Sequence, residues 1–157
     1  MSDLMSLQVG LRHNWSITKI LSLRGFDIVP SKSYEGLFAM LNSQRFHYIP
    51  RGINEIYNEL DSRKSKLNNV VIEPELVLYI PSPTYLFVSP KYPRLAQRFE
   101  DGLELMVANG TLKVIFDKYF THHIERADIK NRRIIVVGNP LLPELTPLER
   151  SDLWWSP

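Results

Sequence analysis

The sequence predicts an α/β fold in which a parallel sheet is covered by helices. Short β-type segments alternate with amphipathic helical segments from Leu7 to Leu60, in the order strand, helix, strand, helix, strand, helix. That order favours a parallel sheet with helices on its faces. Apolar residues make up 44% of the 157 residues and charged residues 23%, as in globular proteins. The length fits one ordinary domain.

The first predicted unit is a strand, a helix and a second strand. Leu7–Arg12 is the first strand, and the turn that follows it leads to Ser16, a suitable N-cap residue. The inner face of the helix carries Ile17, Ile20 and Leu21. Gly25 is expected at the C′ position, where a glycine commonly ends a helix. Phe26–Val29 is the second strand, and Pro30-Ser31 leads onward.

The segment from Ser33 to Gly52, SYEGLFAMLNSQRFHYIPRG, is the central part of the predicted fold and contains a helix, a tight turn and a short strand. Apolar residues at i, i+3, i+4 and i+7 form one helical face: Tyr34, Leu37, Phe38 and Leu41. Ser33 is the expected N-cap, with Glu35 in the first turn where the helix dipole favours a carboxylate. Phe46–Ile49 is a third strand that ends at Pro50, which lacks an N–H. Ligands of open α/β sheets bind beyond the carboxyl ends of strands, so Arg51 is a candidate binding residue.

After Gly52 a third helix is expected, with Ile53, Ile56, Tyr57 and Leu60 on one face, followed by a polar loop. Val70–Val88 is rich in β-type residues but is divided by Pro81-Ser82-Pro83. The sequence leaves two alternatives open for this region, a hinge between lobes or an edge hairpin.

The carboxyl-terminal part predicts two helices, a strand and a tail. Pro93 begins a helix whose apolar residues are expected to face inward (Leu95, Phe99, Leu103 and Met106), and Asn109-Gly110 ends it. Thr111 is expected to cap a helix that continues to Phe120. Arg133–Val137 is a strand. The tail ends in Leu153-Trp154-Trp155, for which packing against the body and contact with a partner are both open.

Composition excludes several classes of protein. A net charge of +2 with scattered basic residues gives no basis for nucleic-acid binding. The chain has no cysteine, which excludes disulfides and thiolate metal sites. No run approaches the roughly 18 apolar residues of a membrane span. The first ten residues have neither the basic nor the apolar region of a secretory signal.

Two candidate sites follow strand ends. The turn with Asn14, Trp15 and Ser16 precedes a helix, where free backbone N–H groups and the positive helix end favour an anion. Arg51 follows the third strand, and its guanidinium is able to pair bidentately with a carboxylate. Each has a purely structural alternative: the turn is a simple N-cap, and Arg51 makes a surface salt bridge.

The sequence contains no catalytic constellation. His122 and His123 are adjacent, so on a helix they lack the i, i+4 spacing of a paired metal-ligand set. No glycine-rich phosphate loop, GxSxG elbow or HExxH motif is present. We therefore expect a protein that is not an enzyme and that needs no cofactor or metal.

Four blocks together resemble the type 2 periplasmic solute-binding proteins that serve amino-acid-type ABC transporters (family 3 extracellular solute-binding proteins). They are QVGLRHNWS, SYEGLFAMLNSQRFHYIPRG, PTYLFVSPKYPRLAQRFEDGLELMVANG and TLKVIFDKYF. The last two are the most specific, because a hinge strand, a proline-started helix, a glycine stop and an IFDKYF-type helix recur near the carboxyl end of that family. The resemblance extends from Leu7 to Phe120.

The resemblance implies two α/β lobes joined by crossing strands, with the solute held between them. Residues 1–83 correspond to the second lobe, and residues 84–157 to a hinge strand, closing helices and tail of the first. The amino-terminal part of the first lobe and a signal peptide are then expected to be missing here. The resemblance also implies a periplasmic location, a small-molecule solute and the membrane subunits of an ABC transporter as partners.

Two departures from the family bear on the solute. The family commonly has Gly-Thr-Thr or Gly-Ser-Thr around the ligand carboxylate, whereas this chain has Asn14, Trp15 and Ser16. Where amino-acid binders place an aspartate for the ligand ammonium, this chain has Arg51. An anionic or differently shaped solute is therefore expected at the interlobe cleft. The alternatives are a sensory or regulatory domain of the same fold and a fragment that binds nothing.

A further expectation concerns the helices from Pro93 to Asn109 and from Thr111 to Phe120. In the resembled family their apolar stripes cover the first-lobe sheet, and the resemblance implies that most of this sheet is missing here. Soluble monomers rarely leave an apolar patch beyond a few hundred Å² uncovered. We expect these helices to self-associate, to aggregate or to fold back onto the chain's own lobe.

Overall fold

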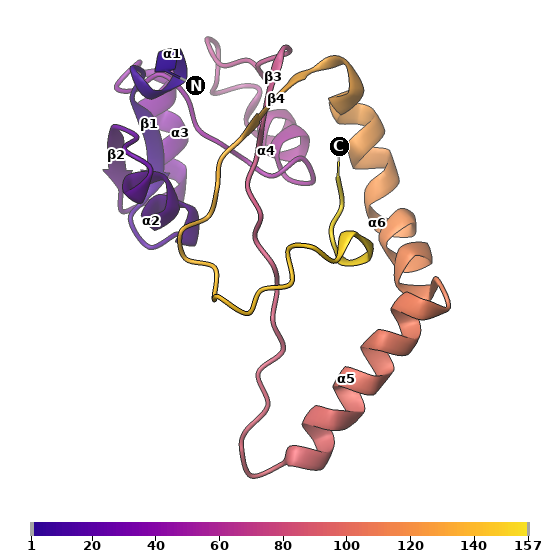
Figure 1. Cartoon of the computed structure of the whole chain (residues 1–157). Helices are drawn as coiled ribbons and strands as arrows, with labels where there is room; N and C mark the ends of the chain where they lie inside the picture. The colour runs from indigo at the N-terminus through magenta and orange to yellow at the C-terminus, as the bar shows by residue number, and fades with distance from the viewer. Residues whose placement is uncertain (1, 157) are drawn as a thin grey trace. The chain divides into compact units, whose positions relative to one another are not determined.

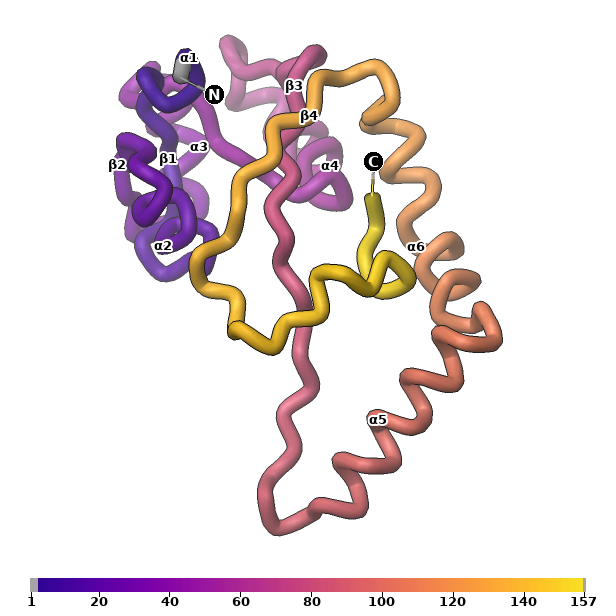
Figure 2. Tube along the Cα trace, in the orientation of Figure 1, coloured from indigo at the N-terminus to yellow at the C-terminus, as the bar shows by residue number. Residues whose placement is uncertain are grey.

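The computed structural model describes residues 2–156 and shows a mixed α/β protein with small parallel sheets (Figure 1). The chain forms two compact units. Unit 1 comprises Met1–Pro81 and Asn131–Leu142, and unit 2 comprises Ser82–Lys130 and Pro143–Pro157. The chain leaves unit 1 after Pro81 and returns to it at Asn131. Figure 2 traces the path of the backbone. Each unit is described by itself.

Unit 1 is built on β1 (Val9–Arg12), which follows a short helix, α1 (Ser2–Met5). Along one edge, β1 pairs in parallel with β2 (Ile28–Ser31), with Gly10 opposite Val29. Along the other edge it forms only a parallel bridge, between Val9 and Tyr48. There the Gly10 N–H donates to the Tyr48 carbonyl at 2.9 Å. The predicted order of parallel strands is confirmed around β1, but the strand expected at Phe46–Ile49 is reduced to one bridge.

The helix between these strands, α2 (Ser16–Leu23), begins one residue earlier than predicted. Its N-cap is Trp15 rather than Ser16, and no side chain caps it. Its end is as predicted, because Gly25 has a φ of 82° and donates to the Ser22 carbonyl, while Phe26 N–H donates to the Leu21 carbonyl. These two hydrogen bonds form a Schellman motif, which satisfies carbonyls at the helix end.

The next helix, α3 (Tyr34–Asn42), confirms the predicted cap, because the Ser33 hydroxyl accepts from the Gly36 N–H at 3.1 Å. Its Leu37 and Phe38 are buried. The third helix, α4 (Ile56–Arg63), starts later than expected, because a turn after Gly52 comes first. Arg51 therefore lies in an extended segment before α4 and not at its first turn.

The core of unit 1 gathers side chains from β1, from α2 and the turn after it, and from Val137, which lies far along the chain. Val9, Leu11, Leu21, Phe26 and Val137 form the buried cluster. Phe46, only 3% exposed, covers Gly10 so closely that a Cβ atom at residue 10 would lie 2.2 Å from two ring carbons. A glycine is therefore required at residue 10 for the ring to pack against the strand.

A second sheet pairs β3 (Leu76–Tyr79) in parallel with β4 (Arg133–Val136). The edge hairpin considered for Val70–Val88 is therefore wrong: β3 takes its partner from the far end of the chain, and Thr84–Val88 is in no strand. Since Val137 belongs to the core of unit 1, residues 131–142 lie with unit 1 and not with the residues that follow Thr84. The Asn139 side chain donates to the Pro81 carbonyl at 2.9 Å, which ties this return to the end of β3.

Unit 2 contains α5 (Pro93–Ala108) and α6 (Thr111–Ala127), joined at Asn109-Gly110. The predicted start and stop of α5 are confirmed, and Gly110 takes a φ of 77°. Gly110, not Thr111, is the N-cap of α6, and α6 continues beyond Phe120. Two short 3-10 turns complete the chain, η1 (Ile129–Asn131) and η2 (Ser151–Leu153). The Trp154 indole donates to the Pro147 carbonyl at 2.9 Å, so this ring packs within its own tail.

The apolar residues of α5 do not face a core. Leu95, Phe99 and Leu103 are 41–43% exposed, and α5 has no buried residue. The prediction that this stripe faces inward is wrong for the described chain. Within the described residues, no helix is both long and apolar enough to cross a membrane.

Candidate functional site

The predicted site residues Asn14, Trp15 and Ser16 follow the carboxyl end of β1, at the start of α2. Asn14 and Ser16 are exposed, and Trp15 is half-buried against the core cluster. The turn is held by the Trp15 N–H, which donates to the Arg12 carbonyl, and by the Thr18 hydroxyl, which donates to the same oxygen at 2.7 Å. The Ser16 hydroxyl thus lies at the exposed amino-terminal end of a helix, whose dipole favours an anion.

Arg51 contacts this turn although it lies far along the chain. Its guanidinium carbon is 4.6 Å from the centre of the Trp15 ring and 5.8 Å from that of Tyr34. The Trp15 and Tyr34 rings meet edge to face, with their centres 6.4 Å apart. Cation–π contacts of this kind stabilise a desolvated guanidinium. The structure therefore brings Trp15 and Arg51 together, as the prediction of a common site requires.

The polar atoms of Arg51 already bind carboxylates of the chain. Arg51 Nε donates to Glu59 Oε2 at 2.7 Å and Nη2 to Oε1 at 2.5 Å, and Nη2 also lies 3.0 Å from Glu55 Oε2. The Arg51 and Glu59 side chains are only 12% and 11% exposed. The alternative of an intramolecular ion pair is thus the state observed, but it is more buried than a surface salt bridge. The bidentate partner expected in a solute is supplied by Glu59.

The Arg51 pair is part of a larger layer on unit 1. Tyr34 donates its hydroxyl to Glu59, and Arg63 lies 5.1 Å from the Tyr34 ring and 4.2 Å from the Phe38 ring. Arg63 in turn pairs with Glu35. We call Trp15, Tyr34, Phe38, Arg51, Glu59 and Arg63 the arginine–aromatic layer. The sequence analysis missed Glu59, because it lies on α4 at no local spacing from Arg51, whereas Glu55 was detectable at i+4.

Charge and burial compete at the centre of this layer. Burial by itself raises the pKa of Glu59, but hydrogen bonds from Arg51 and Tyr34, together with the positive charges of Arg51 and Arg63, lower it below the usual 4.5. Burial and the hydrogen bond to Glu59 raise the pKa of Tyr34. Glu59 is therefore ionised and Tyr34 neutral at neutral pH.

We expect the stability of unit 1 to depend on the protonation of Glu59. Since the folded-state pKa is lowered, the stabilisation is complete above about pH 4.5 and is lost as the pH falls through the folded-state value. Urea unfolding of the wild type and of Glu59→Gln between about pH 2.5 and 7 measures this, because the difference between the two curves should shrink toward low pH. A difference that stays constant over this range would contradict the assignment.

Arg12, at the carboxyl end of β1, is a second cation near the predicted site, and no carboxylate of the described chain pairs with it. Within residues 2–156 Arg12 makes no ion pair, and its buried Nε has no hydrogen-bond partner. The Tyr48 hydroxyl, on the neighbouring segment, is also buried without a partner, and burial raises its pKa to about 12. Buried polar atoms are usually hydrogen-bonded, so Arg12 and Tyr48 are candidates for contact with a group that the chain does not supply. The sequence analysis did not single out either residue.

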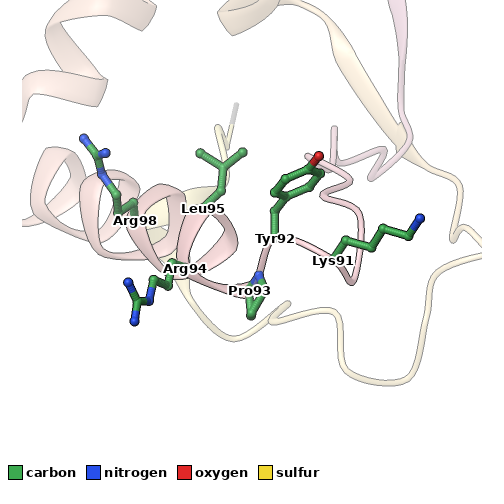
Figure 3. Close-up of a pocket in the computed structure, with 6 residues that line it drawn as sticks. All are labelled: Lys91, Tyr92, Pro93, Arg94, Leu95 and Arg98. Atoms are coloured by element: carbon green, nitrogen blue, oxygen red, sulfur yellow. The ribbon is translucent and has the colours of Figure 1, made fainter.

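A hollow of about 440 Å³ lies elsewhere, in unit 2 at the start of α5 (Figure 3). It is lined by Lys91, Tyr92, Pro93, Arg94, Leu95 and Arg98. The three cationic side chains point in different directions in Figure 3, so they do not converge on one anion. None of the predicted site residues lines it.

No group of three or more histidine, aspartate or glutamate side chains within the described chain is arranged to hold a metal ion. Comparison of the chain with protein-family models, with curated proteins and with solved structures finds no match. The geometry of unit 1 is therefore the basis for assigning a function.

Proposed function

We propose that unit 1 is one lobe of a solute-binding module of the periplasmic-binding-protein type 2 kind. The observation that carries the proposal is the contact between two predicted site residues, Trp15, which follows β1, and Arg51, which follows the neighbouring segment that bridges to β1 through Tyr48. Parallel α/β sheets bind ligands at this edge, beyond the carboxyl ends of their strands. The exposed Asn14 and Ser16 stand beside the contact in the chain and offer polar groups to a solute.

The proposed solute is small and carries a carboxylate or a similar anionic group. Arg51 does not supply the attraction by itself, because its charge is balanced by Glu59 and Glu55. The positive charge available to a solute is that of Arg12, which has no carboxylate partner in the part of the chain that the structure describes. Backbone N–H groups at the start of α2 add to the attraction for an anion.

Calorimetry of the chain against small solutes of matched size, such as a dicarboxylate and a diamine, tests the proposal. The dicarboxylate should bind and the diamine should not. Arg12→Gln and Ser16→Ala should each weaken binding, the former by about 1.5–3 kcal/mol, as expected for a hydrogen bond to a charged group. Arg51→Ala is a poorer test, because it also leaves Glu59 without its partner.

Lys19→Gln is the matched control, because it removes an exposed cation from α2 itself. It should leave binding unchanged. Tight binding of the diamine, unaffected by Arg12→Gln, would refute the proposal for the ligand's charge, and absence of binding across the panel would refute the binding function. In transport, such a module would deliver its solute to the membrane subunits of an ABC transporter, which we propose as its partners.

A further inference from the structure

Three side chains that follow neighbouring parallel segments meet at one edge of unit 1. Trp15 follows β1, Tyr34 follows β2, and Arg51 follows the segment that bridges to β1. The Arg51 guanidinium carbon lies 4.6 Å from the centre of the Trp15 ring and 5.8 Å from that of Tyr34. Since solutes of parallel α/β proteins bind beyond the carboxyl ends of strands, the donors of Tyr34 and Arg51 lie where a solute is expected.

These donors all point to one carboxylate of the chain itself. Glu59 accepts two hydrogen bonds from Arg51, at 2.7 and 2.5 Å, and a third from the Tyr34 hydroxyl. A guanidinium that donates twice, with a hydroxyl beside it, is a carboxylate-binding site, which we call the Arg51–Tyr34 site. The Glu59 side chain that fills it is only 11% exposed. A carboxylate of a solute therefore reaches these donors only when the Glu59 carboxylate leaves them.

The helix that carries Glu59 buries little apolar surface. No residue of α4 is buried, whereas α2 and α3 bury two residues each. No side chain caps the first turn of α4. Segments with few buried apolar contacts are the ones that open locally at a low cost in free energy. Withdrawal of Glu59 from the Arg51–Tyr34 site therefore sacrifices polar contacts rather than core packing.

We propose that Glu59 is an internal competitor for the solute: its carboxylate fills the Arg51–Tyr34 site of the free protein, and a carboxylate of the solute displaces it. The exchange keeps Arg51 paired in both states, so it avoids the cost of a buried charge without a partner. A neutral or cationic solute cannot make the exchange, because it would leave Arg51 without its bidentate partner. The inference rests on the proposed function and adds the means by which the site selects a carboxylate.

Calorimetry at neutral pH with succinate as the probe tests the proposal. Glu59→Gln removes the competing charge, so it should bind succinate at least about tenfold more tightly than the wild type, as expected if Glu59 fills the site roughly nine-tenths of the time or more. Arg51→Leu/Glu59→Leu removes the site as well and should lose this gain. Glu35→Gln is the matched control, because Glu35 is a carboxylate of unit 1 that pairs with a different arginine, Arg63. It should bind like the wild type.

A second measurement does not require that Glu59→Gln be fully folded. Succinate should raise the stability of this variant to urea more than that of the wild type, because a ligand that binds only the folded state shifts the unfolding equilibrium. If the variant is partly unfolded, succinate should restore its circular dichroism. Sodium chloride of the same ionic strength should do neither.

The outcomes separate this inference from the proposed function. If the wild type binds succinate and Glu59→Gln binds it no more tightly, or if Glu35→Gln shows the same gain, the inference is overturned and the proposed function stands. Binding by Glu59→Gln without binding by the wild type would support the inference and refute the proposed function for the unaltered chain. Absence of binding by the wild type and by every variant would refute both.

Discussion

Gly10→Ala should destabilise unit 1 by about 3 kcal/mol, at the upper end of the usual cost of overpacking. A Cβ atom at residue 10 would lie 2.2 Å from two carbons of the Phe46 ring, closer than real contacts permit. Phe46 is buried, so its ring cannot move away from residue 10 without exposing apolar surface or displacing the side chains around it. Urea unfolding followed by circular dichroism measures the loss of stability.

A double variant isolates the cause. Phe46→Leu shortens the obstructing side chain, so Gly10→Ala should cost less in that background than in the wild type, and the two changes should not be additive. Gly102→Ala is the matched control, because nothing lies within 4 Å of a Cβ at residue 102 and alanine is preferred inside a helix. It should leave stability equal or higher. Additive costs for residues 10 and 46 would show that the ring contact is not responsible.

Glu59→Ala should destabilise unit 1 by about 2–3 kcal/mol. The substitution leaves the largely buried guanidinium of Arg51 without its main partner and the Tyr34 hydroxyl without its acceptor. Breaking a buried ion pair costs about 3–5 kcal/mol, and the small remaining exposure of this pair reduces that figure. Fluorescence should report the same event, since Arg51 lies over the Trp15 ring.

A double-mutant cycle measures the pair itself. Arg51→Leu/Glu59→Leu removes both charges, so it should cost much less than the sum of the two single variants. The exposed pair Lys113–Asp117 on α6 is the control, and its cycle should show little or no coupling, as is usual for surface ion pairs. Equal coupling in the two cycles would contradict the burial argument for Arg51 and Glu59.

The sequence determined the elements whose ends depend on neighbouring residues. Ser33 caps α3, Gly25 ends α2, and Pro93 and Asn109-Gly110 bound α5, as predicted. These helix ends depend on hydrogen bonds and backbone angles that involve only a few neighbouring residues. The residue types at those positions therefore predict them without knowledge of the tertiary structure. The parallel order around β1 followed from the alternation of strands and helices, and the meeting of Trp15 and Arg51 followed from their places after neighbouring strand segments.

Only the tertiary structure decided what these elements contact. The Phe46–Ile49 segment keeps a single bridge, and β3 pairs with β4 from the far end of the chain, because strand partners are chosen by packing and not by local sequence. Arg51 is neutralised by Glu59 across two elements, while Arg12 is left without a carboxylate in the described chain. Which charged side chains form an ion pair depends on which of them folding buries together. The presence of an arginine at residue 51 therefore predicted binding to a carboxylate, but it did not predict that this carboxylate belongs to Glu59.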